Sequence, residues 1–138
     1  MISREIIGFW VAMGVSAVTH AAGFSGLFTP LPSSIIPPPD LAFQWQRPNA
    51  TTIEVLIADQ VYLYDAKTHF SVNGQPITVE RPEGQPLDDP LFGLTPVHRG
   101  QISFKIRAST QPIQVEYQGC ADAGFCYPPM QLELSFSR

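Results

Sequence analysis

Apolar and polar residues alternate with a period of two in five stretches of the chain. The alternating apolar positions are Leu41, Phe43 and Trp45; Ile53, Val55 and Ile57; Ile102, Phe104 and Ile106; Ile113, Val115 and Tyr117; and Leu132, Leu134 and Phe136. Successive side chains of a strand point to opposite faces, so this period is typical of a strand with one buried and one solvated face. The five stretches therefore predict half-buried β-strands.

Turn residues separate these stretches at Pro48-Asn49, Asn73-Gly74, Arg99-Gly100 and Thr110-Gln111-Pro112. Asn-Gly is a strong signal for a two-residue hairpin turn. No helix of ten or more residues is expected after Val18. Roughly seven short strands with regular turns in about 115 residues predict an all-β fold, an immunoglobulin-like β-sandwich.

Two segments break the strand pattern. Ser25–Asp40 is rich in Pro and Ser, and Pro37-Pro38-Pro39 predicts extended polyproline that serves as a strap or linker. Arg81–Gly93 holds three prolines, two glycines and the adjacent Asp88-Asp89, which predicts a long surface loop. Long loops in compact domains are often functional, but a solvated connection has the same composition.

The N-terminus has the three-part pattern of a secretory signal peptide. Arg4 precedes an uncharged, mostly apolar run over Ile6–Val18, and small residues stand two positions apart before a cleavage site near Ala21. An uncleaved anchor is the alternative, although a run of about 13 residues is short for a span that needs about 20. The predicted organisation is a signal peptide over 1–21, a Pro-rich extended lead-in over 22–40 and an immunoglobulin-like domain over 41–138.

Composition narrows the functional classes. Hydrophobic residues make up 44% of the 138 residues and charged residues 14%, so the chain has enough apolar material for a core. The net charge of -4 offers no electrostatic footprint for nucleic-acid binding. With only two cysteines, the chain has neither a disulfide-dense scaffold nor a four-cysteine zinc site.

The pair Cys120 and Cys126 admits three interpretations. As a structural disulfide it would close a loop of about seven residues and contribute roughly 2.4 kcal/mol, against about 4 or more for a loop that spans a domain. A local bridge beside a turn is better placed for thiol–disulfide exchange, and export would place it in an oxidising compartment. A metal site would need further ligands, and neither His69 nor His98 shows ligand spacing to the pair, so no metal site is expected.

The residues around the pair carry a resemblance to a known family. Tyr117-Gln118-Gly119 followed by Cys120-Ala121-Asp122-Ala123-Gly124-Phe125-Cys126-Tyr127-Pro128-Pro129 resembles the active-site signature of the N-terminal periplasmic domain of the thiol:disulfide interchange protein DsbD. The similarity extends more loosely from about Gly26 to Phe136. It includes Ser25-Gly26-Leu27-Phe28, Tyr62-Leu63-Tyr64, and Leu94 to Ile106 with Arg99.

The resemblance implies an immunoglobulin-like redox domain in the periplasm of a Gram-negative bacterium. By position, Cys126 resembles the cysteine that forms mixed disulfides with partners, and Cys120 the resolving cysteine. The family implies a thioredoxin-like electron-donor domain fed by a membrane-embedded domain. The implied acceptors are thioredoxin-fold proteins, namely disulfide isomerases and the thioredoxin-like protein of cytochrome c maturation. No cofactor and no nucleic-acid partner are implied, and the domain is expected to be a monomer.

The resemblance also assigns the surroundings of the pair. Asp88, Asp89, Leu91, Phe92 and Gly93 fall in the family's cap loop, which shields the cysteines until a partner docks. The family commonly has a second acidic residue and an aromatic where this chain has Pro90 and Leu91, so shielding here is expected to depend on Leu91 and Phe92. Tyr62 and Tyr64 fall on tyrosines beside the site. Together with Phe92, Phe125 and Tyr127 they would line an apolar docking surface, and core packing is the alternative.

The charges near the pair predict a weakly activated thiol. No cation lies near the cysteines in the sequence, Asp122 lies inside their loop, and Asp89 is expected to approach from the cap. Negative charge disfavours a thiolate. Asp122 is equally explained as a turn residue that bonds its own backbone.

Two further questions stay open at the level of sequence. The chain ends at Arg138, so we expect either a fragment of a longer protein, tethered to the inner membrane through its other domains, or a domain that works in trans with a separate membrane reductase. The alternative function is a non-catalytic secreted immunoglobulin-like binding domain whose disulfide is structural.

Overall fold

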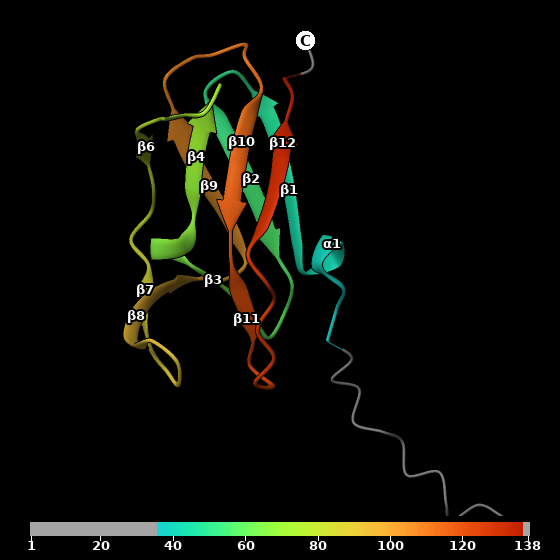
Figure 1. The fold of residues 1–138 in the computed structure, drawn as a ribbon, viewed down its shortest axis with the longest axis vertical. Helices are drawn as coiled ribbons and strands as arrows, with labels where there is room; N and C mark the ends of the chain where they lie inside the picture. The colour runs from blue at the N-terminus through green and yellow to red at the C-terminus, as the bar shows by residue number, and fades with distance from the viewer. Residues whose placement is uncertain (1–35, 137–138) are drawn as a thin grey trace, which may run out of the picture. The chain divides into compact units, whose positions relative to one another are not determined.

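The computed structural model describes residues 36–136 (Figure 1). The predicted signal peptide over 1–21 and most of the lead-in over 22–40 lie outside these residues. Within 36–136 no helix has the length and hydrophobicity that crossing a bilayer requires.

The described chain is almost entirely β-structure. Its two helical turns are α1 (Pro39–Ala42) and the 3₁₀ turn η1 (Asp65–Lys67). One sheet has the order β1-β2-β9-β6, formed by Phe43–Asn49, Thr52–Ile57, Gln101–Ile106 and Val79–Glu80. A second has the order β12-β10-β4-β5, formed by Met130–Leu134, Ile113–Tyr117, His69–Val72 and Gln75–Pro76. A third has the order β11-β3-β8-β7, formed by Gly119–Ala121, Val61–Tyr64, Gly93–His98 and Gln85–Asp89.

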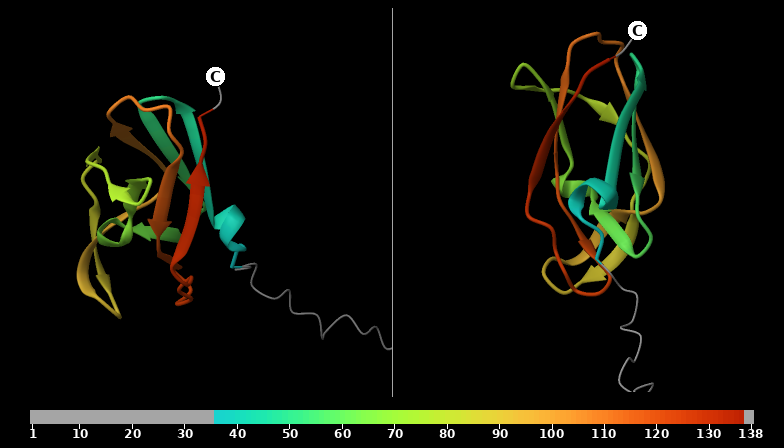
Figure 2. Two further views of the ribbon diagram at one scale, coloured as in Figure 1. Left: turned by 45° about the horizontal axis from the view of Figure 1, so that its top comes forward. Right: turned by 90° about the vertical axis from the view of Figure 1, so that its right-hand side faces the viewer.

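The first two sheets pack face to face and enclose the core (Figures 1 and 2). Buried residues from both sheets form one cluster, whose members include Phe43, Ile53, Val55, Phe70, Phe104, Ile113, Val115 and Tyr117. Trp45 lies against three of the aromatic rings, those of Phe70, Phe104 and Tyr117. This arrangement is the immunoglobulin-like sandwich that the sequence predicted.

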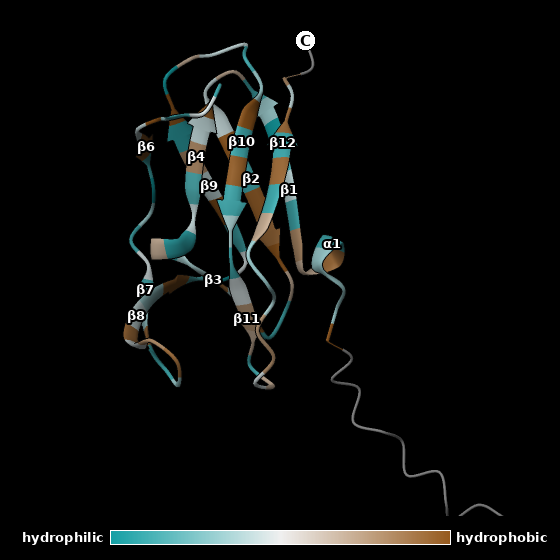
Figure 3. Cartoon of the chain, in the orientation of Figure 1, coloured by the Kyte–Doolittle hydropathy of each residue, from teal (hydrophilic) through white to brown (hydrophobic). Residues whose placement is uncertain are grey.

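The period-two pattern located the strands of both sheets well. In β10 the buried Ile113, Val115 and Tyr117 alternate with exposed Gln114 and Glu116, and the alternation is visible in Figure 3. The boundaries differ at two ends: Leu41 belongs to α1, and Phe136 lies beyond β12. Proline explains the first difference, because Pro39 stands at the start of α1, where its fixed φ suits a helical turn.

The Asn73-Gly74 hairpin is confirmed. It joins β4 to β5, and both residues have positive φ, 50° and 77°. A two-residue hairpin turn with positive φ at both central positions favours Asn followed by Gly.

The prediction of a long surface loop over Arg81–Gly93 was wrong in part. Gln85–Asp89 forms β7, which pairs antiparallel with β8 and makes a hairpin. The strand escaped the sequence pattern because it buries no apolar face: Asp89 is its one buried residue, and Leu87 is half-buried. The expected cap is therefore the tip of a hairpin.

The third sheet lies at one end of the sandwich, at the bottom of Figure 1, and carries the cysteine pair. Its central strand β3 pairs on one side with β11, which contains Cys120, and on the other side with β8 of the hairpin. Because β3 borders both, it fixes the distance between the cysteines and the hairpin tip.

Candidate redox site

Cys120 and Cys126 form a disulfide across a tight hairpin loop. Their Cα atoms are 3.9 Å apart, and the two residues form an isolated antiparallel bridge. The amide of Ala121 donates to the carbonyl of Phe125, and Gly124 supplies the positive φ of 93° that the turn needs. Local backbone geometry thus brings the two sulfurs together, as the spacing predicted.

The two sulfurs differ in accessibility. Cys120 lies in β11 opposite Tyr62 and is 1% exposed, whereas Cys126 lies after the turn and is partly exposed. The preceding Gly119 presses against the carbonyl of Tyr62 and the ring of Phe43, so a Cβ there would clash at 2.2 and 2.5 Å. Only glycine permits this close approach, which keeps Cys120 inside the domain.

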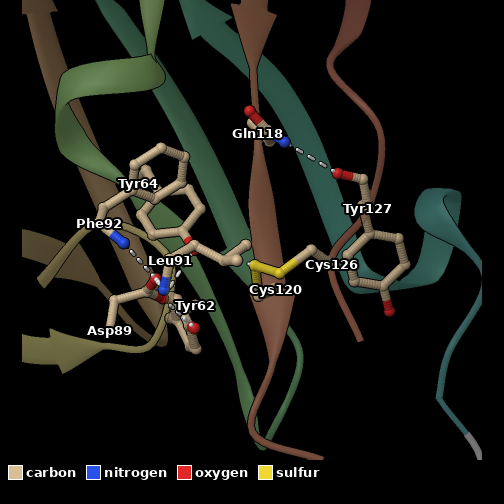
Figure 4. The surroundings of a disulfide bond; sticks show 9 residues. All are labelled: Tyr62, Tyr64, Asp89, Leu91, Phe92, Gln118, Cys120, Cys126 and Tyr127. Carbon is tan, nitrogen blue, oxygen red and sulfur yellow. Dashed lines mark hydrogen bonds between the residues drawn. A yellow bond between two sulfur atoms is a disulfide. The ribbon is translucent and has the colours of Figure 1, made fainter. Parts of the chain in front are cut away.

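The carboxylate of Asp89 is the centre of a buried hydrogen-bond network (Figure 4). The hydroxyls of Tyr62 and Tyr64 each donate to its Oδ2 at 2.7 Å. The amides of Leu91 and Phe92 donate to its Oδ1 at 2.8 and 3.0 Å. Burial alone raises the pKa of Asp89, but these four bonds favour the ionised form more strongly and lower the pKa from 3.8 to about 2.

Tyr64 connects this network to the cysteine pair. Its oxygen lies 3.0 Å from Sγ of Cys120. A tyrosine hydroxyl has one hydrogen, and that of Tyr64 is donated to Asp89, so a lone pair of the oxygen faces the sulfur. Burial, followed by the bond to Asp89, raises the pKa of Tyr64, which therefore keeps its proton at neutral pH.

The hairpin tip covers the pair. The side chain of Leu91 points at the disulfide in Figure 4, although 67% of the residue remains exposed. Phe92 packs edge-on against the ring of Tyr64, with 5.1 Å between centroids. The ammonium of Lys67, the last residue of η1, lies 5.0 Å from the centroid of the Phe92 ring. Asp89 holds the tip in place because it binds the amides of both capping residues.

Asp122 has a partner that the sequence did not reveal. Arg99, directly after β8, donates from Nη2 to Oδ1 of Asp122 at 2.8 Å and from Nη1 to Oδ2 at 3.1 Å. The ion pair compensates the charge of Asp122, although no cation lies near this residue in the sequence. Its backbone amide bonds the carbonyl of Gln60 rather than its own side chain.

Tyr127 and Phe125 occupy different environments. Tyr127 is buried in the core cluster, its hydroxyl donates to the carbonyl of Pro37 at 2.6 Å, and its carbonyl accepts from Gln118. It is thus a core residue that also ties the end of the lead-in to the redox loop. Phe125 is substantially exposed and packs edge-on against Tyr127.

Two of the sequence-predicted residues stay apart from the pair. Asp88 is exposed and faces Leu94 across the hairpin. Gly93 is exposed and supplies a positive φ of 67° at the turn. The side chains of Asp89, Leu91, Phe92, Tyr62 and Tyr64 do gather around the cysteines.

Sequence reasoning gave no role to Arg99 or Lys67 at the site. Arg99 belonged only to a stretch of family resemblance, and nothing in its spacing indicated Asp122 as its partner. Among residues 36–136, no group of three or more His, Cys, Asp or Glu side chains is placed to hold a metal ion.

Comparisons with known proteins show the family of the chain and agree with its fold. A family model described as the N-terminal part of the thiol:disulfide interchange protein DsbD matches residues 33–137. The chain belongs to this family. A DsbD from Pectobacterium atrosepticum is 34% identical over 128 residues, which cover 87% of the chain and 22% of the relative. The DsbD of Escherichia coli K12 is 32% identical over 114 residues, which cover 77% of the chain and 20% of the relative.

Two solved structures of DsbD N-terminal domains from Neisseria meningitidis resemble the fold. The domain in its reduced form is 26% identical, with a TM-score of 0.62 over 75% of this chain and 90% of the other. The same domain in complex with the PilB N-terminal domain is 29% identical, with a TM-score of 0.57 over 75% and 89%. The chain spans about a fifth of the length of these two curated DsbD relatives.

Proposed function

We propose that this domain is a periplasmic thiol–disulfide exchange module in which Cys126 meets the partner and Cys120 resolves the mixed disulfide. The observation that carries the proposal is the difference in exposure between the two sulfurs. An attacking sulfur must approach along the S–S axis. It can reach the partly exposed Cys126, whereas Cys120 is enclosed by β3 and Tyr64.

The exchange consists of two displacements that balance. In the dithiol form, the thiolate of Cys126 attacks one sulfur of an acceptor disulfide, and the acceptor's other sulfur leaves and takes up a proton. Cys120 then attacks Sγ of Cys126, so the domain becomes a disulfide and the acceptor a dithiol. A donor dithiol reverses the sequence and returns two electrons and two protons to the domain.

The Asp89 network sets the chemistry of Cys120. In the dithiol form, the thiol of Cys120 can donate to the oxygen of Tyr64, which faces it at 3.0 Å. That bond and the negative Asp89 both favour the neutral thiol. Neither Tyr64 nor Asp89 supplies a proton at neutral pH, because one has a raised pKa and the other is ionised. The domain would therefore react slowly with unspecific disulfides.

Docking would then select the partner. A thioredoxin-like donor, in the same protein or in trans, and periplasmic thioredoxin-fold acceptors fit a surface with three exposed apolar residues. The hairpin tip contributes Leu91 and Phe92, and the disulfide loop contributes Phe125. A domain of the same family from N. meningitidis forms a complex with the PilB N-terminal domain, which supports recognition of separate protein domains. The proposed acceptors are disulfide isomerases and the thioredoxin-like protein of cytochrome c maturation.

Single cysteine variants test this assignment. The reduced chain is mixed with an oxidised periplasmic disulfide isomerase, and adducts are counted on non-reducing gels. Cys120→Ser should accumulate a mixed disulfide that a reductant releases, and Cys126→Ser should form none. Reduction of the isomerase by both variants would refute the proposal.

The reduction potential separates exchange from a structural staple. Equilibration with a glutathione buffer should give a value that a thioredoxin-like donor can reach. A value below about -300 mV would instead indicate an inert bridge in a non-catalytic binding domain.

A further inference from the structure

Arg99 joins two parts of the site that are distant in sequence, the disulfide loop and β3. Its guanidinium forms a two-point ion pair with Asp122, a residue inside the disulfide loop. It also lies 5.1 Å from the ring centroid of Tyr62 and 3.5 Å from the carbonyl of Val61, both in β3. The loop is thus held against the strand that carries the Asp89 network.

We propose that Arg99 is a positioning residue that stabilises the closed disulfide loop and so makes the pair harder to reduce. The proposal rests on the exchange function above for its biological meaning, since a domain that relays electrons needs a defined reduction potential. Arg99 acts through Asp122 and does not touch the reacting sulfurs.

The loop is ordered by different means in the two redox forms. In the disulfide form, the bond between Cys120 and Cys126 closes a ring of residues that includes Asp122. The carboxylate of Asp122 is therefore already in place for the guanidinium of Arg99. Reduction breaks the S–S bond and adds two electrons and two protons, which leaves one hydrogen on each sulfur. The loop then keeps only non-covalent contacts, such as the bonds from Ala121 to Phe125 and from Gly124 to Ala121.

Forming the ion pair between Arg99 and Asp122 therefore requires more ordering of the loop in the dithiol form than in the disulfide form. Ordering a segment costs conformational entropy, so the ion pair is weaker after reduction. By linkage, an interaction that is stronger in the disulfide form favours that form to the same extent. Loss of Arg99 should shift the equilibrium toward the dithiol.

The expected size follows from exposure. The side chains of Arg99 and Asp122 are 33% and 44% exposed, so solvent screens the ion pair. We expect the equilibrium constant for disulfide formation to fall about threefold in Arg99→Ala. For a two-electron couple this corresponds to a potential about 14 mV less negative.

A glutathione titration of the full chain tests the proposal without any protein partner. The protein is equilibrated in buffers with different ratios of reduced to oxidised glutathione. Two glutathione thiols reduce the protein disulfide to the dithiol and become one glutathione disulfide. The fraction of protein in the dithiol form is measured by thiol labelling. The variants are Arg99→Ala, Arg99→Lys, Asp122→Asn and the double variant Arg99→Ala/Asp122→Asn. Arg107→Ala is the matched control, since this exposed arginine directly follows the last residue of β9, whereas Arg99 lies just before the first.

Arg99→Ala and Asp122→Asn should each lower the equilibrium constant for disulfide formation about threefold, and the double variant should lower it no further than either alone. Arg99→Lys should recover part of the loss, because an ammonium keeps the charge but not the two-point geometry. Arg107→Ala should match the unaltered chain.

A purely structural role predicts a different pattern. Arg99→Ala would then lower the unfolding free energy of both redox forms equally and leave the equilibrium constant unchanged, which would overturn the proposal. Full additivity in the double variant would also overturn it. Failure of the exchange function would have a different outcome. The unaltered chain would then capture no oxidised isomerase, although the Arg99 variants would still change the equilibrium constant for disulfide formation as expected.

Discussion

The oxygen of Tyr64 lies 3.0 Å from Sγ of Cys120 while the hydrogen of the same hydroxyl is donated to Asp89. The cysteine therefore faces an acceptor backed by a buried negative charge. Such an environment stabilises a thiol and opposes a thiolate. The weakly activated thiol that we predict therefore rests on Asp89 and Tyr64, since Arg99 compensates Asp122.

Neutralising Asp89 should make Cys120 more acidic. In a Cys126→Ser background, Asp89→Asn removes the negative charge and frees the hydrogen of Tyr64 to bond the sulfur. The pKa of the Cys120 thiol should fall. Ultraviolet absorbance of the thiolate, followed against pH, measures it. Asp88→Asn is the control, because this exposed neighbour has the same charge and faces away from the pair. Equal shifts in both variants would contradict the role of Asp89.

The same carboxylate should make stability depend on acid pH. The pKa of Asp89 is depressed in the folded state, from 3.8 to about 2, so its ionised form stabilises the fold above the unfolded pKa. That contribution, roughly 2 kcal/mol, should be lost as pH falls from about 4 to about 2. Urea unfolding of the disulfide form should therefore show a gap between the unaltered chain and Asp89→Asn at neutral pH that closes near pH 2. A gap that stays constant with pH would rule out this linkage.

Shortening the capping leucine should expose the disulfide. Leu91 points at the pair, so Leu91→Ala should raise the rate of reduction by glutathione about threefold, a barrier change of well under 1 kcal/mol. Stopped-flow measurement under excess glutathione gives the rate. Leu94→Ala is the matched control, because this residue is 77% exposed on the same hairpin. An unchanged rate in Leu91→Ala would show that Leu91 does not shield the bond.

Arg47 should matter for stability and not for redox chemistry. Its buried guanidinium donates to the carbonyls of Ser109, Gln111 and Leu134. Leu134 pairs with Ile113 at the start of β10, whereas the cysteine loop follows the other end of that strand. Arg47→Met leaves these carbonyls without their donor and should lower the free energy of unfolding by roughly 2 kcal/mol.

The control for this variant is Arg107→Met, which replaces an exposed arginine and should lower the free energy of unfolding only slightly. The reduction potential of Arg47→Met should equal that of the unaltered chain. A shifted potential would mean that the two ends of the sandwich are coupled.

The strands of the two main sheets were predictable because their signal is local. A strand such as β10 must place every second residue in the core, and that requirement appears directly as alternation in the sequence. The Asn73-Gly74 turn was predictable for the same reason, since positive φ at two adjacent positions restricts the residue type. The spacing of the cysteines likewise reflects a local hairpin.

The sequence by itself therefore determined the sandwich, the hairpin turns and the closeness of the two sulfurs. Only the tertiary structure decided that Gln85–Asp89 is an edge strand, that Asp89 binds two tyrosines, and that Arg99 pairs with Asp122. A strand that buries no apolar face needs no alternation, and the partners of a carboxylate depend on which strands become neighbours in a sheet. The chemical environment of Cys120 arises from that long-range pairing, because β3 lies between the cysteine strand and the capping hairpin.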